Sequence, residues 1–492
     1  MDFLDPNKKR ANTIKLYTGY ILMAIAIAMG ALVLLFAIFG YGFNEGKVVQ
    51  NGLVFFSSQP ESVDVYIEGL TKDFKDNDKT NTKFTLNEGR YKATLIKDKY
   101  RSWQREFSLA GGSVLRMLYP FLFPENLDTT SKESYSSQPG IVTSTPDRQF
   151  IVIQSPDNFL KFDIFQANNP EEPKTTIEMP ASILSATTGT QSLKVIEWAN
   201  DNKNVLLQHK FDEGVEYVLF NIDSPSESYN VNQKINQNPY SIQLQDKKID
   251  RMFIQTAPNG LLELIDMKSN AITPLVVSSL AFKSYGDDML VYVTPNETDS
   301  SLVSLRVKNN EDDYELKSLP ASPTAEYLVD VARFDDSWYI TAASSEDDEV
   351  YIYKDPLEVL KNSDANKSIF ARTMRLDNPT NLSFSANTRF IAAQSGKNFA
   401  VYDADEDRQF RYEIQENIDT SRPARWMDGH RLITNVDGNV FVFDFDGINS
   451  QTLMPIVPTT NTLFDRDYTV FYSVAKNESG FTLTQTPMRI ED

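Results

Sequence analysis

A degenerate repeat begins near residue 141, and it limits the possible folds more than any other feature of the sequence. Each unit reads as an apolar strand, a short polar turn, a second strand, another turn and a third strand in which apolar and polar residues alternate. The first turn of each unit carries one marker residue, and these markers are Asp147, Asp201, Asp246 or Asp250, Asp287, Asp335, Asn387, Asp428 and Asp465. Units of about 40–50 residues that supply four strands each are typical of β-propeller blades.

Eight units can be counted, so the sequence predicts an all-β propeller of eight four-stranded blades over residues 141–492. Seven blades are the alternative, because the unit near residue 250 is weak. The last unit ends near Pro487, which leaves too few residues for a fourth strand. Since an unpaired strand edge would split the ring, we expect a closing strand from about Asn126 to Ser137, inside a connector at 118–140.

The repeats resemble those of TolB-like and WD-repeat propellers. They share a hairpin in which Ser or Trp stands two residues before Asp or Asn, but the Gly-His and Trp-Asp signatures are missing. His430 follows Asp428-Gly429 in a turn and is not part of such a signature. Propellers include both binding proteins and enzymes, so the resemblance leaves the function open.

The N-terminal part of the chain contains a long apolar run. No charged residue occurs from Leu16 to Asn44, and Tyr20–Phe39 would form a helix of about 30 Å, the thickness of a bilayer core. A cleaved signal peptide is the alternative, but this run is longer than the apolar part of such peptides and no good cleavage site follows it. We therefore expect an uncleaved transmembrane helix within 16–44, after a cytoplasmic tail at 1–15.

The charges around this run predict its orientation. Four basic residues precede it, whereas Glu45 and Lys47 follow it, so the positive-inside rule places the N-terminus in the cytoplasm. The chain beyond residue 47 would then be extracytoplasmic, and it carries 43 basic and 65 acidic residues. We expect a single-pass protein of the cell membrane. A strongly acidic chain is a poor match for phosphate backbones, so no nucleic acid partner is expected.

The 492-residue chain has no cysteine and only two histidines, His209 and His430. A cysteine nucleophile, a disulfide framework and a zinc–thiolate or iron–sulfur site are therefore excluded. Avoidance of cysteine outside the cytoplasm fits a bacterial secretory route better than an animal one. The sequons at Asn296, Asn366, Asn381 and Asn477 are then chance matches to a short pattern.

Several strands are expected between the apolar run and the repeats. They are Leu53–Ser57, Asp64–Ile67, Lys83–Leu86, Tyr91–Ile96 and Trp103–Leu109. Their short length and period-2 alternation predict a small β-sandwich over residues 50–117. The aromatic segment Leu118–Pro124 contains two prolines and cannot form a regular helix. We expect a stiff connector packed between two domains, with contact to a membrane or a partner as the alternative.

This module resembles the PEGA domain. Pro60-Glu61 match the first half of the name-giving motif, and Ser62-Val63 replace its Gly-Ala. Leu86, Gly89 and Tyr91 match a second signature, and Tyr100 and Trp103 match a third, in which Lys99 stands where the family favours glycine. The resemblance implies an extracytoplasmic β module with a binding or spacer role and no catalytic residues.

Three other patterns of acidic residues are candidates for chemical sites. Two of them, Asp76–Asp78–Thr80 and Asp403–Asp405–Asp407, have the spacing of a calcium loop, but Asn81 and Arg408 occupy the position that requires glycine. The third, Glu346–Glu349, is a charge run that we interpret as a solvated hairpin tip. Neither histidine lies beside a nucleophile motif. The sequence thus nominates no catalytic, cofactor-binding or metal-binding residue and leaves the ligand-binding residues unknown.

These features together favour a non-enzymatic, membrane-anchored scaffold whose propeller docks an envelope protein or a cell-wall polymer. One alternative is a propeller hydrolase or lyase that acts on glycans through carboxylates in the central funnel. Another is the sensory arm of a membrane complex. Convergent carboxylates beside exposed aromatic residues would favour the enzyme.

Overall fold

The computed structural model describes residues 6–38, 40–44, 47–71, 73–169, 171–186, 188–212, 214–310, 312–362, 369–478 and 480–490. The chain divides into two compact units, Met1–Asn126 and Leu127–Asp492. The division falls inside the predicted connector at 118–140.

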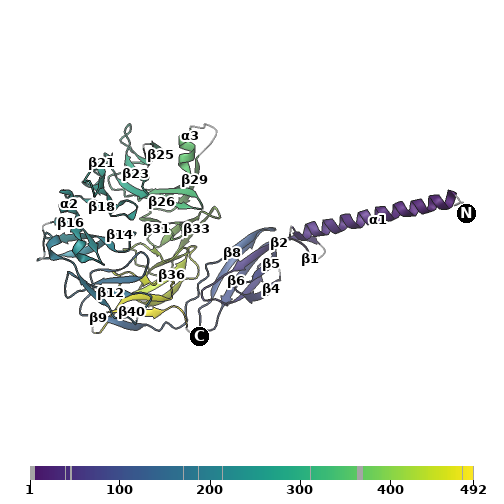
Figure 1. Ribbon diagram of the computed structural model, residues 1–492, viewed down its shortest axis with the longest axis horizontal. Helices are drawn as coiled ribbons and strands as arrows, with labels where there is room; N and C mark the ends of the chain where they lie inside the picture. Colours follow the sequence, from purple (N-terminus) through teal and green to yellow (C-terminus); the bar gives the residue numbers. More distant parts are fainter. Residues whose placement is uncertain are drawn as a thin grey trace. The chain divides into compact units, whose positions relative to one another are not determined.

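The first unit begins with a single long helix, α1 (Pro6–Ile38), drawn in purple in Figure 1. The most apolar 18 residues within Lys9–Phe36 have a mean hydropathy of 2.5, and every side chain from Lys9 to Phe36 is exposed. Near its C-terminal end the ring of Phe36 contacts that of Tyr41 edge-on, with the centroids 5.3 Å apart. Within the described residues, this is the one helix long and apolar enough to cross a membrane.

The predicted transmembrane segment at 16–44 needs one correction. Its last residues, Tyr41–Asn44, form the strand β1 rather than helix. Gly40 stands between the two elements with a φ of 73°. This left-handed conformation suits glycine and commonly ends a helix.

The remainder of the first unit is a sandwich of two sheets. In one sheet, β2 (Lys47–Phe56) pairs with β1, with β5 (Lys83–Asn87) and, in parallel, with β8 (Val114–Met117). The other sheet has the order β4 (Lys75–Lys79), β3 (Asp64–Gly69), β6 (Gly89–Ile96) and β7 (Trp103–Leu109). Phe56 of β2 contacts Phe107 of β7 edge-on, so aromatic side chains fill the space between the sheets. All five strands expected from the sequence are present.

The strand β4 is not among the strands expected from the sequence, because its sequence KDNDK has no apolar residue. It is an edge strand whose side chains are all exposed, so pairing with β3 alone defines it. The calcium pattern of this segment does not form a site. Asp76 and Asp78 are exposed on β4, whereas the buried hydroxyl of Thr80 accepts a hydrogen bond from the backbone N–H of Val63.

The aromatic segment at 118–124 packs into the first unit. Phe121, Leu122 and Phe123 are each at most 5% exposed. Gln59 holds the segment through two backbone hydrogen bonds, one donated to the carbonyl of Pro120 and one accepted from the N–H of Leu122. Residues 120–124 are thus a buried part of the module, whereas Leu118 is exposed.

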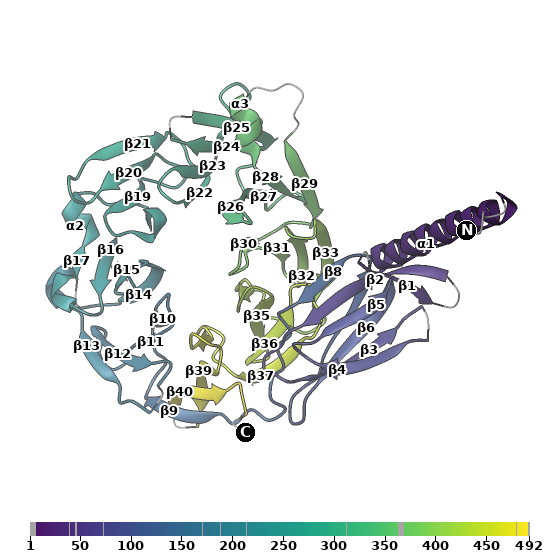
Figure 2. The ribbon, with the colours of Figure 1, turned by 45° about the vertical axis from the view of Figure 1, so that its right-hand side comes forward.

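The second unit is a β-propeller of eight four-stranded antiparallel sheets, as the sequence predicts (Figure 2). Blades 1 to 4 are β10 (Val142–Ser144), β11 (Phe150–Gln154), β12 (Lys161–Gln166) and β13 (Thr175–Glu178); β14 (Ser192–Trp198), β15 (Asn204–Phe211), β16 (Gly214–Asn221) and β17 (Tyr229–Asn230); β18 (Ser241–Leu244), β19 (Arg251–Gln255), β20 (Leu262–Asp266) and β21 (Ile272–Val276); and β22 (Ala281–Tyr285), β23 (Met289–Pro295), β24 (Leu302–Asn309) and β25 (Asp312–Pro320).

Blades 5 to 8 are β26 (Tyr327–Phe334), β27 (Ser337–Ser344), β28 (Glu349–Lys354) and β29 (Phe370–Arg375); β30 (Asn381–Phe384), β31 (Phe390–Ser395), β32 (Asn398–Asp403) and β33 (Arg408–Glu413); β34 (Arg425–Trp426), β35 (Arg431–Val436), β36 (Asn439–Asp444) and β37 (Gln451–Pro455); and β38 (Leu463–Phe464), β39 (Val470–Asn477), β40 (Gly480–Pro487) and β9 (Thr130–Tyr135). Short helical turns lie between strands: η1 (Ala181–Ile183), η2 (Pro225–Glu227), α2 (Val231–Ile235), η3 (Gln245–Lys247) and α3 (Pro356–Asn362). The first strand of each blade lies nearest the propeller axis, and the fourth lies at the rim (Figure 2).

The ring closes with a strand from before the first repeat, which confirms the prediction of a borrowed strand. β9 pairs antiparallel with β40 and completes blade 8. Tyr135 of β9 is 6% exposed and packs with Ile151 and Ile153 of blade 1 and Leu483 of blade 8. The weak third unit is also a complete blade, so the alternative of seven blades is wrong.

Candidate functional site

The two faces of the propeller differ in how they are held together. One face, the turn face, carries the turns between the first two strands of each blade, and all the marker residues of the repeat lie there, with Asp246 in blade 3. Bonds join many of these turns to the next: Asp147 N–H to Asn202, Asn200 N–H to the Lys247 carbonyl, Gln245 to the Asp287 carbonyl, Thr388 to the Arg333 carbonyl and Tyr468 to the Met427 carbonyl. The turn face is therefore tied together by polar contacts.

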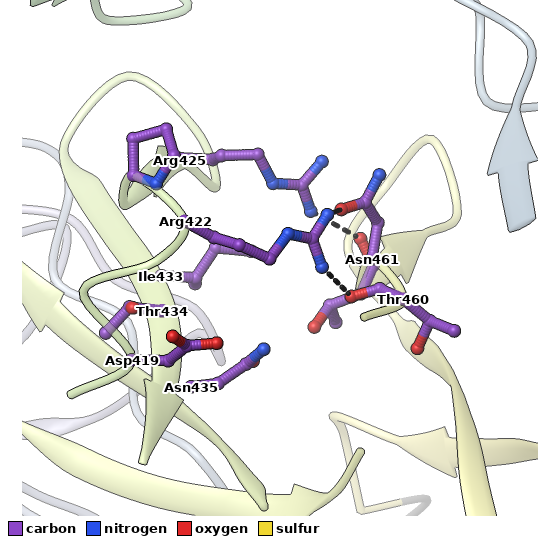
Figure 3. Close-up of a pocket in the computed structure, with 10 residues that line it drawn as sticks. Asp419, Arg422, Arg425, Ile433, Thr434, Asn435, Thr460 and Asn461 are labelled. Atoms are coloured by element: carbon purple, nitrogen blue, oxygen red, sulfur yellow. Dashed lines mark hydrogen bonds between the residues drawn. The ribbon is translucent and has the colours of Figure 1, made fainter. Parts of the chain in front are cut away.

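The opposite face carries the links between blades and the loops between second and third strands, and we call it the connection face. Three cavities of about 200, 820 and 300 Å³ are lined by these links. The smallest lies between blades 7 and 8, and we call it the arginine cavity (Figure 3). Its walls come from the β33–β34 link, from β35 and from the β37–β38 link, and include Asp419, Arg422, Arg425, Asn435 and Asn461.

The guanidinium of Arg422 is fixed in place by the β37–β38 link. Its Nη1 donates to the carbonyls of Pro458 (2.7 Å) and Thr460 (2.9 Å), and its Nη2 donates to Oδ1 of Asn461 (2.7 Å). Figure 3 shows the bonds to Thr460 and Asn461. These bonds use three of the five N–H donors of an arginine. Arg422 is therefore oriented before any ligand arrives.

Arg425, the first residue of β34, points into the same cavity (Figure 3). Among the described residues, its hydrogen-bond partner is the carbonyl of Thr462, at 3.3 Å from Nη2. By its accessible surface Arg425 is an exposed residue at the mouth of the cavity, although many protein atoms lie near its guanidinium. Burial, followed by the positive charge of Arg422, lowers the pKa of Arg425 to about 10. The positive charges of the two arginines therefore repel each other across the cavity.

Among the described residues, neither arginine of the cavity is neutralised by an ion pair, although the carboxylate of Asp419 lines the same cavity. Within the described part of the chain, no carboxylate oxygen forms an ion pair with Arg422 or Arg425. Asp419 lines the wall, but its Oδ1 accepts from the N–H and the hydroxyl of Ser421. The chain as a whole has a formal charge of −20, so this cavity places two positive charges on the surface of an acidic protein.

The arginine cavity adjoins a second one of about 300 Å³. Arg422, Thr460 and Asn461 line both. The neighbour adds Lys194, an exposed residue of β14. Together, the two cavities place three cationic side chains on the connection face across blades 7, 8, 1 and 2.

Two carboxylates near the axis have raised pKa values, Glu197 of β14 and Asp330 of β26. Burial is the main cause in both cases. Each accepts a hydrogen bond from the first strand of the next blade, Glu197 from the N–H of Leu244 and Asp330 from that of Phe384. Lys283 lies 3.8 Å from Asp330. These two acids lie on blades 2 and 5 and are engaged in joining blades.

The histidines do not form a catalytic triad. His209 is fully buried, with Nδ1 2.8 Å from Oε1 of Glu216. Ser185 also contacts Glu216, so the hydroxyl and the imidazole share the acid rather than each other. The ring of His430 packs edge-on against Phe390, with the centroids 5.5 Å apart.

The acidic patterns singled out in the sequence are engaged by other side chains. Arg389 binds Asp403 at 2.6 Å and Asp405 at 2.8 Å, and Arg372 binds Asp407. Glu346 accepts a hydrogen bond from the hydroxyl of Thr324. Among the residues that the structure describes, no cluster of His, Asp and Glu has the arrangement of a metal site. The turn face has a cavity of about 510 Å³ between blades 5 and 6, and Asp407 is part of its wall.

Sequence reasoning missed the two arginines. Both lie in the short run Ser421–Arg425, SRPAR, which links two repeat units. Two arginines in the link of an acidic chain were a usable signal, but only the folded ring shows that they share a cavity.

Comparison with known proteins adds similarity of overall structure only. No protein-family model and no curated protein matches the chain, so the PEGA resemblance stays a prediction. Solved structures that align with it include the β-propeller domain of Cps50 (Swd1) from Myceliophteria thermophila, with 11% identity, 68% of this chain and 100% of that chain covered, and a TM-score of 0.38.

Two further alignments have the same character. Oligogalacturonate lyase from Vibrio parahaemolyticus shows 10% identity over 74% of this chain and 97% of that chain, with a TM-score of 0.37. Hsv2p from Kluyveromyces lactis shows 10% identity over 71% of this chain and 98% of that chain, with a TM-score of 0.36. Similarity at this level carries no argument about a ligand or an activity.

Proposed function

We propose that this chain is a membrane-anchored, non-enzymatic binding protein of the cell envelope. In this proposal α1 is the single membrane anchor, its N-terminus lies in the cytoplasm, and the propeller outside docks an envelope protein or a cell-wall polymer through the connection face. A bacterial envelope fits the avoidance of cysteine.

The observation that carries this proposal is the contrast between the two faces. Bonds between neighbouring turns occupy backbone and side-chain groups of the turn face. Both faces carry cavities, but the connection face has three of them, including the largest at about 820 Å³, together with the arginine pair that forms no ion pair among the described residues. Concave sites with a few converging polar groups are where proteins bind ligands.

The PEGA-like module fits a role as a spacer between membrane and propeller. The two positions where the family favours glycine, Ser62 and Lys99, have φ values of 57° and 64°. Glycine adopts such values without strain. The backbone therefore keeps a conformation suited to glycine although the residues differ, which supports the resemblance.

The rival proposal of a glycan hydrolase or lyase requires paired carboxylates with different tasks. Glu197 and Asp330 are the acids with raised pKa values among the described residues, and raised values often mark catalytic acids. Their bonds to the backbone of the next blade give them a structural role instead. We therefore favour binding over catalysis.

Site-specific photo-cross-linking in intact cells tests the docking face. One variant of the full chain carries the photoreactive residue at Lys194, on the connection face, and its matched control carries it at Asp336, which is 97% exposed on the turn face. Both sites are accessible and charged. We expect a discrete cross-linked product from position 194 that is absent from position 336. Identical products from both positions, or none from 194, would contradict docking through the connection face.

A further inference from the structure

We propose that the arginine cavity is a binding site for an anionic group on a hydroxyl-rich molecule, such as a sugar phosphate, a polyol phosphate or a uronic acid. This inference rests on the proposed binding function and gives the connection face a ligand chemistry.

The donors available in the cavity define the charged part of the ligand. Three of the five N–H groups of Arg422 donate hydrogen bonds to the β37–β38 link. One N–H group of Arg425 donates to the carbonyl of Thr462. Donors of both guanidinium groups therefore remain for a ligand. Arginine presents them in a planar fork that matches the oxygens of phosphate and carboxylate groups.

The energetics of the unliganded cavity point to the same chemistry. Two guanidinium groups repel each other, and that repulsion contributes to the lowered pKa of Arg425. An anion bound between the two guanidinium groups offsets this repulsion. It also accepts the hydrogen bonds that the guanidinium N–H groups would otherwise donate to water. Arg422 is already oriented, so a ligand has only Arg425 to order, and preorganisation of this kind favours binding.

The other lining residues define the neutral part of the ligand. Asp419, Asn435 and Asn461 contribute carboxylate and amide groups, which are partners for hydroxyls. The cavity contains no aromatic residue, so it offers no platform for stacking a base or a ring. A volume of about 200 Å³ holds roughly six water molecules. That is room for one anionic group and the first sugar or polyol unit, with Lys194 in the adjoining cavity for a further charge.

The roles of the two arginines differ, and this makes Arg425 the informative position. Arg422 ties blade 7 to the link before blade 8, so its replacement also removes three structural bonds. Arg425 has a single bond of 3.3 Å, so Arg425→Gln removes the charge with little structural loss. Arg425→Lys keeps the charge and loses the fork. Arg411→Gln is the matched control, because Arg411 is an exposed arginine on the rim strand β33.

Titration calorimetry of the full chain in uncharged detergent micelles tests the proposal at neutral pH and constant ionic strength. The probes are inorganic phosphate, glycerol 3-phosphate, glucose 1-phosphate, glucuronate and neutral glucose. We expect saturable binding of at least one anionic sugar or polyol and none of glucose. Loss of one charge-assisted contact predicts affinity about tenfold weaker in Arg425→Gln, an intermediate loss in Arg425→Lys, and no change in Arg411→Gln.

The ranking of the probes separates the two sources of charge. Tighter binding of the phosphate esters assigns a phosphate-containing ligand, and tighter binding of glucuronate assigns a uronic acid. Binding of glucose as tight as that of the anions, equal binding by wild type and Arg425→Gln, or no saturable binding of any anion would each overturn the proposal. Purified protein is used, so a failure here is distinct from a failure of the docking face in cells.

Discussion

Closure of the ring by β9 makes a quantitative prediction for Tyr135. This side chain is 6% exposed at the seam between blades 8 and 1, and Tyr135→Ala would leave a cavity among Ile151, Ile153 and Leu483. Truncating a buried aromatic residue to alanine typically costs about 3–5 kcal/mol, so we expect a loss of about 4 kcal/mol. In Tyr135→Phe only the hydroxyl is lost, and its bond to Asp163 is long at 3.3 Å. We expect that loss to stay within about 1 kcal/mol.

Thermal unfolding of the full chain measures this effect. The unit Leu127–Asp492 has 366 residues, and an unfolding entropy of about 2.1 cal/mol/K per residue gives about 0.8 kcal/mol/K for the unit. A loss of about 4 kcal/mol therefore lowers the midpoint by about 5 °C. Tyr240→Ala is the matched control, since that tyrosine is 56% exposed in the same unit, and it should leave the midpoint unchanged.

Deletion of residues 125–138 should have a larger effect than Tyr135→Ala. It also removes the backbone pairing of β9 with β40 and the ion pair between Glu133 and Lys174. An unchanged midpoint for both the point variant and the deletion would refute the reasoning. β9 would then be a tether that contributes nothing to the closed ring.

Three further predictions concern stability. Ser62→Gly and Lys99→Gly should each stabilise the N-terminal module by about 0.5–1 kcal/mol, which differential scanning calorimetry can measure. A left-handed conformation costs a non-glycine residue about 1–2 kcal/mol, but glycine loses more conformational entropy on folding, which offsets part of the gain. Asp330→Ala should destabilise the propeller by about 1–3 kcal/mol in urea unfolding, because the N–H of Phe384 loses its acceptor. The pKa of Arg425 is lowered in the folded protein, so its positive charge destabilises the folded state at every pH below about 10, and this destabilisation declines as the pH rises above about 10. Arg425→Gln should therefore stabilise the unliganded protein at pH 7 by up to about 1 kcal/mol, because solvent screens part of the effect, and by less above pH 10.

The propeller was predictable from sequence because its repeat unit has a strong local cause. Asp201, for example, accepts hydrogen bonds from the N–H groups of Lys203 and Asn204 and thereby fixes the turn between β14 and β15. Asp428 does the same for His430 and Arg431. Such turns recur once in each blade, 37 to 54 residues apart, so the blade count and the need for a borrowed strand both follow from sequence pattern.

The parts that sequence reasoning missed depend on the folded ring or on pairing alone. β4 has no apolar residue to mark it as a strand, and only its pairing with β3 creates it. Arg422 and Asn461 are 39 residues apart in the chain and come together only when blade 8 follows blade 7 around the axis. Conversely, the calcium-like spacing of Asp403, Asp405 and Asp407 can be read from the sequence. The ion pairs that these acids form with Arg372 and Arg389 cannot, because they depend on the folded blades.

The central claim is that α1 anchors the chain in the membrane with the propeller outside the cytoplasm. A reporter that is active only outside the cytoplasm, fused after Asp492, tests it most directly, together with a second reporter that is active only inside. The account predicts activity of the first reporter alone, and digestion of the propeller by protease added to intact cells or spheroplasts. Activity of the cytoplasmic reporter at Asp492, with the propeller protected from external protease, would contradict the claim and the proposed function with it.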